Sequence, residues 1–329
     1  MRLITLEEHF RAPMLMETAA GQAFAQAMGT PGSPMAQRMA KLDELGEHRL
    51  ADMDAGGIDM QVLSHNVPGA ERFAPDEGIP LARAVNDFIA EAVANHPERF
   101  AAFAMLPMQA PLEAADELER TVTELGFKGA MVYGHTEGRF LDDRSLWPVL
   151  ERAQRLAVPI YLHPSEPPDA VREAYYAGGL APRVGQMLAT SGWGWHVETG
   201  MHVLRMVLGG VFDEYPQLQL IVGHMGEALP FLLARSSRGL TQAAGLGKPL
   251  EEYVVEHVHF TTSGLFTYPP LLCLLMVVGA DRVLLSVDYP FSDNEQGRDF
   301  ILAAPISPED REKIAHGNAE RLLRLQPSR

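Results

Sequence analysis

Two carboxylates and an imidazole stand together near the start of the chain, in the stretch Leu6-Glu7-Glu8-His9-Phe10. An apolar run precedes them, so the stretch is typical of the end of a β-strand. Residues two apart on a strand point to the same side, so Glu7 and His9 should project together. A carboxylate oxygen and a neutral imidazole nitrogen suit a divalent transition metal. By itself, the stretch also fits a strand that simply ends in a polar turn.

Three later apolar runs end in side chains that can bind a metal or transfer a proton. They end at His163, at His224 with Glu227 three residues further on, and at Asp288. A single histidine after a strand more often packs or caps than binds a metal. Four such ends on parallel strands, however, converge on one axial cavity when the strands close into a barrel. We therefore expect one site that is built from several strand ends.

The elements that must position these residues alternate regularly along the 329-residue chain. Short β-rich apolar runs predict eight strands, and a longer amphipathic stretch that predicts helix follows each. The strands are expected at residues 2–6, 58–64, 100–105, 127–133, 158–162, 218–223, 258–263 and 282–287. The helices are expected at about residues 36–54, 80–96, 112–125, 145–156, 197–213, 227–238 and 268–278, with a final pair near 307–325. The alternation predicts an α/β fold, a single (β/α)8 TIM barrel domain over residues 1–329, with a doubly wound sheet as the alternative.

Two long segments interrupt this alternation, at residues 10–35 and 164–196. Each follows a predicted strand end, so each should lie on the C-terminal face of the barrel as a long loop. Loops on that face usually build and cover the active site. Trp193 and Trp195 in the second segment could line a flat pocket or pack the segment itself.

The composition excludes several kinds of partner. Acidic residues number 43 against 27 basic ones, which gives a net charge of −16, so we expect no nucleic acid and no anionic membrane surface as a partner. The single cysteine, Cys273, lies in an apolar run and leaves no internal disulfide. The sequence shows no signal-like or long apolar segment, and we expect a cytoplasmic protein.

The motifs resemble those of the amidohydrolase superfamily, and within it the branch of non-oxidative aromatic acid decarboxylases. The resemblance extends over most of the chain, and the pairing of GHMGE with VDYPF is its most specific part. Members of this branch include γ-resorcylate, 2,3-dihydroxybenzoate and 5-carboxyvanillate decarboxylases. The segments that carry it are LEEHF at 6–10, ADMDAGGID at 51–59, FKGAMVYGHTEGRFLDD at 127–143, LHP at 162–164, GVFDEYPQLQLIVGHMGEALPF at 210–231 and SVDYPF at 286–291.

Residue by residue, the resemblance implies that one divalent ion is held by Glu7, His9, His163 and Asp288. Nitrogen and oxygen ligands suit zinc or manganese, and the carboxylates keep magnesium possible. Binuclear hydrolases of the superfamily use a carboxylated lysine at the end of the fourth strand, whereas Lys128 stands at the start of that predicted strand. We therefore expect one metal ion rather than two.

The reaction implied is the release of carbon dioxide from an ortho-hydroxylated, dihydroxybenzoate-like aromatic acid. The ring carbon that bears the carboxylate must be protonated first, because direct cleavage would leave an aryl carbanion. Asp288 is the expected acid, and the resemblance places His224 with Glu227 beside the metal, where they would relay the proton or order a water. The resemblance also implies that Arg235 holds the substrate and that Phe291 helps to form an aromatic pocket.

Two other functions fit parts of the pattern. A metal-dependent hydrolase of a lactone or amide could use the same scaffold, but the missing lysine and the closer resemblance favour the decarboxylase. A binding protein without chemistry is disfavoured because the whole set of histidines and carboxylates is present. We expect a carboxy-lyase that acts on a small aromatic acid and assembles as a homo-oligomer, a dimer or tetramer, as similar enzymes do.

Overall fold

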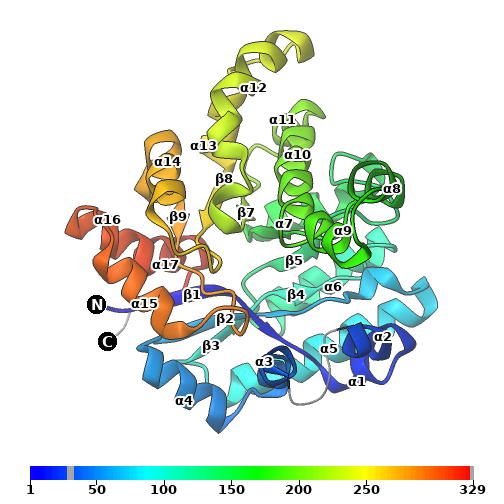
Figure 1. The fold of residues 1–329 in the computed structure, drawn as a ribbon, viewed down its shortest axis with the longest axis vertical. Coiled ribbons are helices and arrows are strands. Elements are labelled where there is room, and N and C mark those ends of the chain that lie inside the picture. The colour runs from blue at the N-terminus through cyan, green and yellow to red at the C-terminus, as the bar shows by residue number, and fades with distance from the viewer. Residues whose placement is uncertain (28–32, 327–329) are drawn as a thin grey trace.

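A ring of parallel strands with helices around it forms the centre of the molecule (Figure 1). The computed structural model describes residues 1–27 and 33–326. The predicted strand at residues 100–105 is divided in two at Phe103, which is why nine strands occupy eight positions. The strands are β1 (Ile4–Phe10), β2 (Met60–His65), β3 (Phe100–Ala102), β4 (Ala104–Met105), β5 (Ala130–Tyr133), β6 (Ile160–His163), β7 (Leu220–Val222), β8 (Val258–Thr261) and β9 (Val283–Leu284).

Backbone contacts close this ring on both sides. The strands pair in parallel as β1-β2-β3 and as β4-β5-β6-β7-β8-β9. Phe103, between β3 and β4, donates its N–H to the carbonyl of Leu63 at 2.9 Å and so joins the two sets. Leu6 bridges Ser286 in parallel and donates its N–H to Leu285 O at 3.2 Å, so the first strand meets the last. The predicted (β/α)8 barrel is confirmed, and the doubly wound alternative is wrong.

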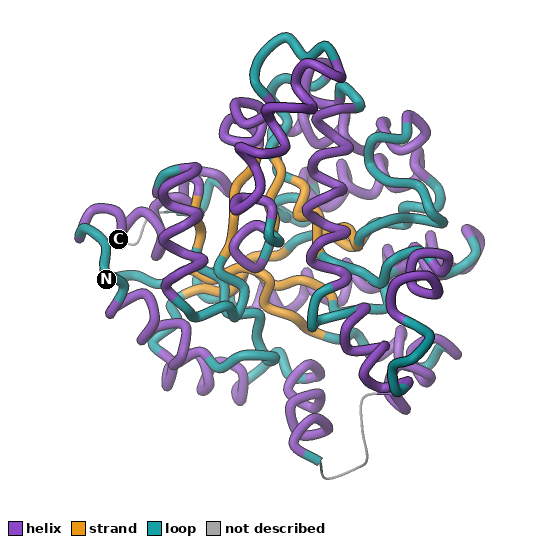
Figure 2. The backbone as a smooth tube through the Cα atoms, turned by 45° about the horizontal axis from the view of Figure 1, so that its top comes forward, coloured by secondary structure: helices purple, strands orange, loops and turns teal. Residues whose placement is uncertain are grey.

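The helices form an outer layer around the strands (Figure 2). They are α1 (Pro13–Met16), α2 (Ala19–Ala27), α3 (Pro34–Ala40), α4 (Glu47–Gly56), α5 (Pro75–Asn95), α6 (Pro111–Thr123), α7 (Trp147–Leu156), α8 (Asp169–Tyr176), α9 (Pro182–Ala189), α10 (Gly194–Leu208), α11 (Val211–Glu214), α12 (Leu229–Ala244), α13 (Leu250–His257), α14 (Tyr268–Val278), α15 (Asn294–Ala303), α16 (Pro308–Glu312) and α17 (Asn318–Leu323). None of the helices described is long and apolar enough to cross a membrane.

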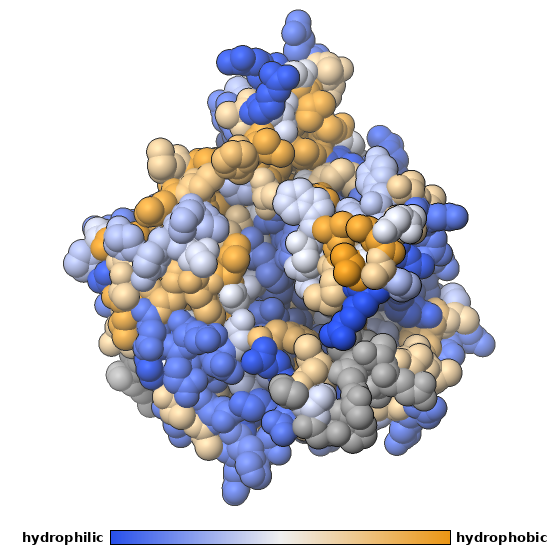
Figure 3. All heavy atoms as spheres, in the orientation of Figure 1, coloured by the Kyte–Doolittle hydropathy of each residue, from blue (hydrophilic) through white to orange (hydrophobic). Residues whose placement is uncertain are grey.

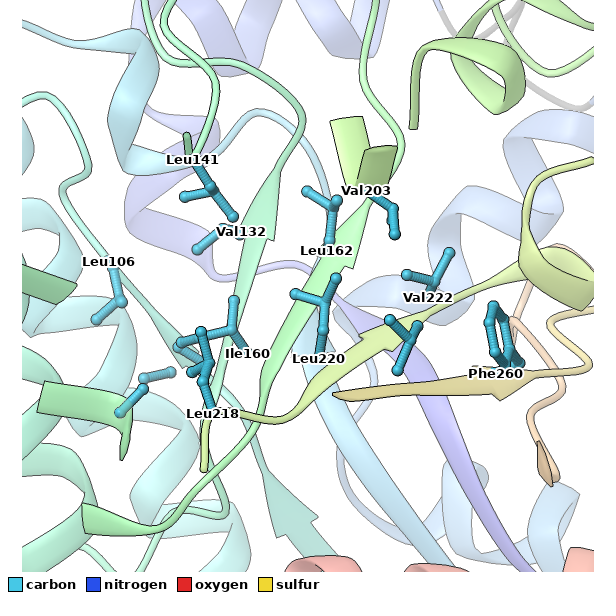
Figure 4. Packing of buried hydrophobic residues seen from close by; sticks show 14 of the residues in the cluster. Leu106, Val132, Leu141, Ile160, Leu162, Val203, Leu218, Leu220, Val222 and Phe260 are labelled. Carbon is cyan, nitrogen blue, oxygen red and sulfur yellow. The ribbon is translucent and has the colours of Figure 1, made fainter. Parts of the chain in front are cut away.

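Strand alternation divides the buried side chains into two clusters. Ile160 and Leu162 of β6 belong to the cluster between strands and helices, which Figure 4 shows together with Leu220 and Val222 of β7. Tyr161, between the two β6 residues, belongs to the second cluster, inside the barrel. Both faces of each strand are therefore buried, as expected for a parallel barrel. The same alternation directs the residue after Leu162 toward the barrel axis.

The two long segments that interrupt the alternation are partly helical, contrary to the loops expected from the sequence. The first contains α1 and α2, although its residues 28–32 lie outside the described part of the chain. The second contains α8 and α9 before α10 begins. Proline at the first turn helps to start α1 and α9, because its fixed φ fits the helix and its missing N–H is not needed there. These segments are therefore built elements rather than plain loops.

Candidate active site

A β-bulge in β1 selects which side chains reach the barrel axis. Thr5 pairs with Gln61 and Glu8 pairs with Leu63, so β1 has one extra residue between these pairs. Ile4 and Leu6 already point inside the barrel, and simple alternation would send Glu8 there next. Glu7 instead takes a left-handed φ of 60°, which shifts the alternation by one residue. Glu7 and the residue two further on then face the interior together.

The ends of β1 and β6 and the loop after β9 bring four predicted ligands together. The Nε2 atom of His163 lies 3.1 Å from Oε1 of Glu7. The Nε2 atom of His9 lies 3.3 Å from Oδ1 of Asp288. One ligand atom from each of Glu7, His9 and His163 lies within 4.8 Å of the others. Nitrogen and oxygen atoms at these separations can share one divalent ion.

Hydrogen bonds at the outer ring nitrogens turn the two imidazoles toward this centre. His163 donates its Nδ1–H to the carbonyl of Pro164 at 2.7 Å, and His9 shares a hydrogen bond between Nδ1 and Ser64 Oγ at 3.2 Å. Such contacts fix the tautomer that leaves a lone pair on Nε2. On the inner side, His9 Nε2 is buried and has no hydrogen-bond partner in the described part of the chain. Both imidazoles are thus oriented as metal ligands are.

The two carboxylate oxygens of Glu7 likewise have different surroundings. Its Oε2 accepts hydrogen bonds from the hydroxyls of Tyr161 and Ser263. Its Oε1 is buried and, among the described residues, has no donor. Burial opposes ionisation, but the neighbouring imidazoles, His224 first, outweigh it and hold the pKa of Glu7 below its usual range. An ionised, buried oxygen without a donor beside two imidazole lone pairs fits a divalent cation.

A second cluster adjoins the first and is linked by hydrogen bonds. His224 follows β7 in a 3-10 turn (His224–Gly226), and its Nδ1 lies 2.7 Å from Oε1 of Glu227. The other carboxylate oxygen, Oε2, bonds to Nδ1 of His196. On its far side, His224 Nε2 lies 3.9 Å from Oδ2 of Asp288. The four side chains therefore form a continuous path from the first cluster outward.

Charge in this second cluster favours a protonated imidazole beside a carboxylate. Burial disfavours the charged ring, but the carboxylates of Glu227 and Glu7 outweigh it and raise the pKa of His224 well above its usual value. Burial by itself would raise the pKa of Glu227, but His224 and His196 outweigh burial, and the pKa of Glu227 is lower than its usual value. The carboxylate of Glu227 thus stabilises the protonated imidazole of His224, which can then act as a general acid.

His196 has a role that the sequence did not reveal. It lies at the start of α10, 31 residues from its partner Glu227, and no local motif marks it. Its Nε2 lies 3.0 Å from the indole Nε1 of Trp195, which needs a lone pair on Nε2, and 3.1 Å from Ser191 O, which needs a proton there. This nitrogen therefore has both a donor and an acceptor within hydrogen-bond distance. Trp193 has a half-exposed side chain and forms no ring contact within the described residues.

Glu8 lies behind the first cluster and braces its backbone. Its carboxylate accepts the N–H of Val287 at 2.9 Å and that of Tyr289 at 3.2 Å, the residues on either side of Asp288. Asp288 itself has a left-handed φ of 63°, which is costly for a residue other than glycine. Arg49, fully buried, donates its Nη1–H to the carbonyl of His9 at 2.7 Å. Burial raises the pKa of Glu8 to about 8.

Two predicted substrate groups differ in their relation to the cluster. The Phe291 ring is 5.8 Å from the His9 ring, edge to face, so it borders the centre. Arg38 donates a hydrogen bond to the carbonyl of Phe291 and brings a cation there that the sequence did not reveal. Arg235 lies on an exposed face of α12 and forms no hydrogen bond or ion pair within the described residues, so its assignment stays a prediction.

Lys128 and two further histidines at strand ends, His65 and His135, lie outside the cluster. Lys128 precedes β5, at the barrel end opposite the ligands, and donates its backbone N–H to Ala102 O. His135 accepts the N–H of Gly138 at 3.0 Å, which is a turn contact. His65 is buried against Phe10, with ring centroids 5.4 Å apart. Packing and capping account for the two histidines.

Comparisons with known proteins show the family of this chain. The family model described as "Amidohydrolase" matches residues 15–325. The chain is 39% identical to "Decarboxylase orsB" of Emericella nidulans, covering 98% of this chain and 97% of that protein. It is 36% identical to a gamma-resorcylate decarboxylase of Polaromonas sp., covering 98% of each.

A solved structure extends the similarity to the whole fold. The crystal structure of a dihydroxybenzoic acid decarboxylase from Polaromonas sp., with bound manganese and the inhibitor 2-nitroresorcinol, is 35% identical to this chain. The two structures agree with a TM-score of 0.87, covering 99% of this chain and 98% of that one.

Proposed function

Since the chain belongs to the amidohydrolase family, as its motifs predicted, we propose that it is a metal-dependent decarboxylase of ortho-hydroxylated aromatic carboxylic acids. It is a carbon–carbon lyase, carried by one barrel domain. The observation that carries the proposal is the convergence of four side chains on one centre. Glu7 Oε1 and His9 Nε2 are buried there without a hydrogen bond to any described residue, and they face the ring of His163 and the carboxylate of Asp288.

Glu7, His9, His163 and Asp288 are the groups that would hold one divalent ion. A bound ion supplies a Lewis acid that can orient the carboxylate and the ortho oxygen of the substrate together and lower the pKa of the phenol. We favour manganese over zinc or magnesium because a similar decarboxylase binds it. Ser64 and the carbonyl of Pro164 hold the two imidazoles in place by hydrogen bonds.

The protein's acid then acts on the ring carbon that bears the carboxylate. Asp288 delivers a proton to that carbon, which forms a C–H bond while the ortho oxygen supplies electron density. The C–C bond to the carboxylate then breaks, its electron pair returns to the ring, and carbon dioxide leaves. His224, 3.9 Å from Asp288 Oδ2, returns the proton to Asp288 or orders a water between them. Glu227 keeps His224 charged and oriented for this step.

The substrate ring would lie against Phe291, whose ring borders His9. Arg235 is the proposed partner of the substrate carboxylate or a ring hydroxyl, by a bidentate fork. Figure 3 shows a hydrophilic hollow near the centre of the face it presents, with hydrophobic side chains on either side. A flat aromatic acid, polar at one edge and apolar on its faces, suits such surroundings.

The proposal is tested by screening substrates on the metal-analysed protein. Purified protein should contain about one divalent ion per chain and should release carbon dioxide from dihydroxybenzoates, followed by loss of ultraviolet absorbance. Chelation should abolish this activity, and adding Mn²⁺ should restore it. If hydroxybenzoates are inert while lactones or amides are hydrolysed, the alternative hydrolase is correct and the decarboxylase is not.

We also propose that the chain forms a homo-oligomer through the outer faces of α12 and α14. Phe231 of α12 is 81% exposed and Met276 of α14 is 88% exposed, and Leu232 and Leu272 beside them are also exposed. Contiguous apolar side chains of this size on packed helices are typical of an interface. Light scattering should give a dimer or tetramer mass, and Phe231→Glu with Met276→Glu should give a monomer. A monomeric wild-type chain would contradict this assignment.

A further inference from the structure

The described part of the chain has a cavity of about 530 Å³ at the end of the barrel opposite the proposed active site. Pro159, Gln219 and Arg282 line it, and each directly precedes a strand, β6, β7 and β9 respectively. Since the strands are parallel, their first residues share one end, and Glu7 and His163 lie at the other. The cavity is therefore separate from the catalytic cluster, and nothing in the proposed reaction uses it.

The cavity concentrates positive charge in an acidic protein. Arg282, Arg321 and Arg324 line it, against the single carboxylate of Asp281. Among residues 1–27 and 33–326, none of these three guanidinium groups forms an ion pair, although acids outnumber bases by 43 to 27. Burial, and then the charge of Arg321, lower the pKa of Arg282. A negative ligand would relieve this repulsion.

A buried donor without a partner also lines the cavity. His259, on β8, is only 5% exposed. Its Nε2 accepts from Nη1 of Arg282 at 3.1 Å, so the ring proton is on Nδ1. That Nδ1 has no acceptor in the described residues. Leaving a buried N–H without an acceptor is unfavourable, so the site favours a ligand that presents an acceptor oxygen.

Two of the three guanidinium groups, those of Arg282 and Arg321, are held in place before any ligand binds. Arg282 also donates to Gln219 Oε1 at 3.0 Å. Arg321 donates its Nη2–H to Asn318 Oδ1 at 2.8 Å and to the carbonyl of Asp281 at 3.1 Å. Groups fixed in this way lose less conformational entropy on binding.

We propose that this cavity is a binding site for a phosphate group, either free or carried by an organic phosphate monoester. A dianion with several acceptor oxygens matches three guanidinium groups and one neutral N–H donor. The cavity is larger than a phosphate ion, and Val158, Pro159 and Leu322 give its remaining lining an apolar character. The organic part of a monoester would lie against these three side chains.

Binding is measured on the full chain by calorimetry and by thermal unfolding, with inorganic phosphate and adenosine 5′-monophosphate as separate probes. Both should bind saturably at ionic strength held constant with sodium chloride, and both should raise the Tm. Tighter binding of the nucleotide identifies an organic phosphate as the ligand class, and equal binding identifies the phosphate group alone.

Arg321→Gln with Arg324→Gln should weaken binding of both probes at least tenfold. Both side chains are exposed, so the variant should fold as the wild type does. Arg238→Gln, an exposed arginine on α12, is the matched control and should bind as the wild type does. A Tm rise no greater in phosphate than in chloride, or unchanged affinity in the double variant, would overturn the proposal.

Discussion

Replacing Glu227 by glutamine tests how the second cluster supports the acid. The carboxylate is 2% exposed and bonds to Nδ1 of both His224 and His196. Glutamine has nearly the same shape but offers one acceptor oxygen and one NH2 group. One imidazole therefore loses its acceptor, and the other keeps a neutral hydrogen bond in place of a charged one.

The size of the effect follows from these two bonds. Hydrogen bonds to charged groups contribute about 1.5–3 kcal/mol, and neutral ones about 0.5–1.5 kcal/mol. Losing one charged bond and replacing the other by a neutral one should remove about 2.5–4.5 kcal/mol, or roughly 70- to 2,000-fold in kcat. Because Glu227 raises the pKa of His224, the variant should lose its acidic form at lower pH. The rate deficit should therefore grow as the pH rises.

The assay is the kcat for a dihydroxybenzoate, measured between pH 6 and 9, together with metal content by mass spectrometry. Glu309→Gln, which changes a glutamate that is 80% exposed, is the control for the loss of one negative charge. Glu227→Gln should retain its metal, since Glu227 contacts none of the four proposed ligands. A kcat within twofold of the wild type would refute the reasoning, and loss of the metal would show that Glu227 belongs to the metal site.

The other predictions concern the ligands, the substrate and stability. Asp288→Asn should abolish turnover yet leave some substrate binding by calorimetry, and retained activity would remove Asp288 as the acid. Arg235→Ala should raise KM with little change in kcat, and an unchanged KM would count against its role. Glu8→Gln should leave the metal content intact, because Glu8 points away from the axis toward Val287. Burial lowers the pKa of His202 to about 3. Below pH 6.5 the unfolded state therefore binds a proton at this residue that the folded state does not bind. Stability should therefore fall with pH, by about 2 kcal/mol at pH 5 from this residue, and urea unfolding at pH 7 and 5 should show a smaller difference for His202→Gln.

The barrel and the polar side chains at its strand ends could be predicted because both depend on local patterns. Apolar runs of strand length ended at His163 and near His224, where the structure ends β6 and β7. Some boundaries moved for physical reasons. The helix expected at 80–96 begins at Pro75, since Pro80 is accommodated within the early part of α5. Helices α13 and α15 were not predicted, because α13 continues directly into β8 without a loop.

Contacts between distant segments could not be predicted. The pairing of His196 with Glu227 depends on how α10 packs beside the turn after β7. The inward position of Glu7 rests on a bulge, which no residue type in β1 announces. Residues i and i+2 of a strand share a face, and this rule placed Glu7 and His9 on the same side. Alternation from the apolar residues before them would instead have predicted that Glu8 faces the barrel interior.

The pairing of β1 with the segment after β9 also affects how the chain folds during synthesis. One edge of β1 pairs with β2, but its other edge pairs with residues near 285–289, which are synthesised long after β1. During synthesis that edge stays open, and an open strand edge is a template for aggregation. The two adjacent carboxylates of Glu7 and Glu8 place negative charge there during that interval. These charges thus reduce the tendency of the open edge to pair with another chain until the barrel closes.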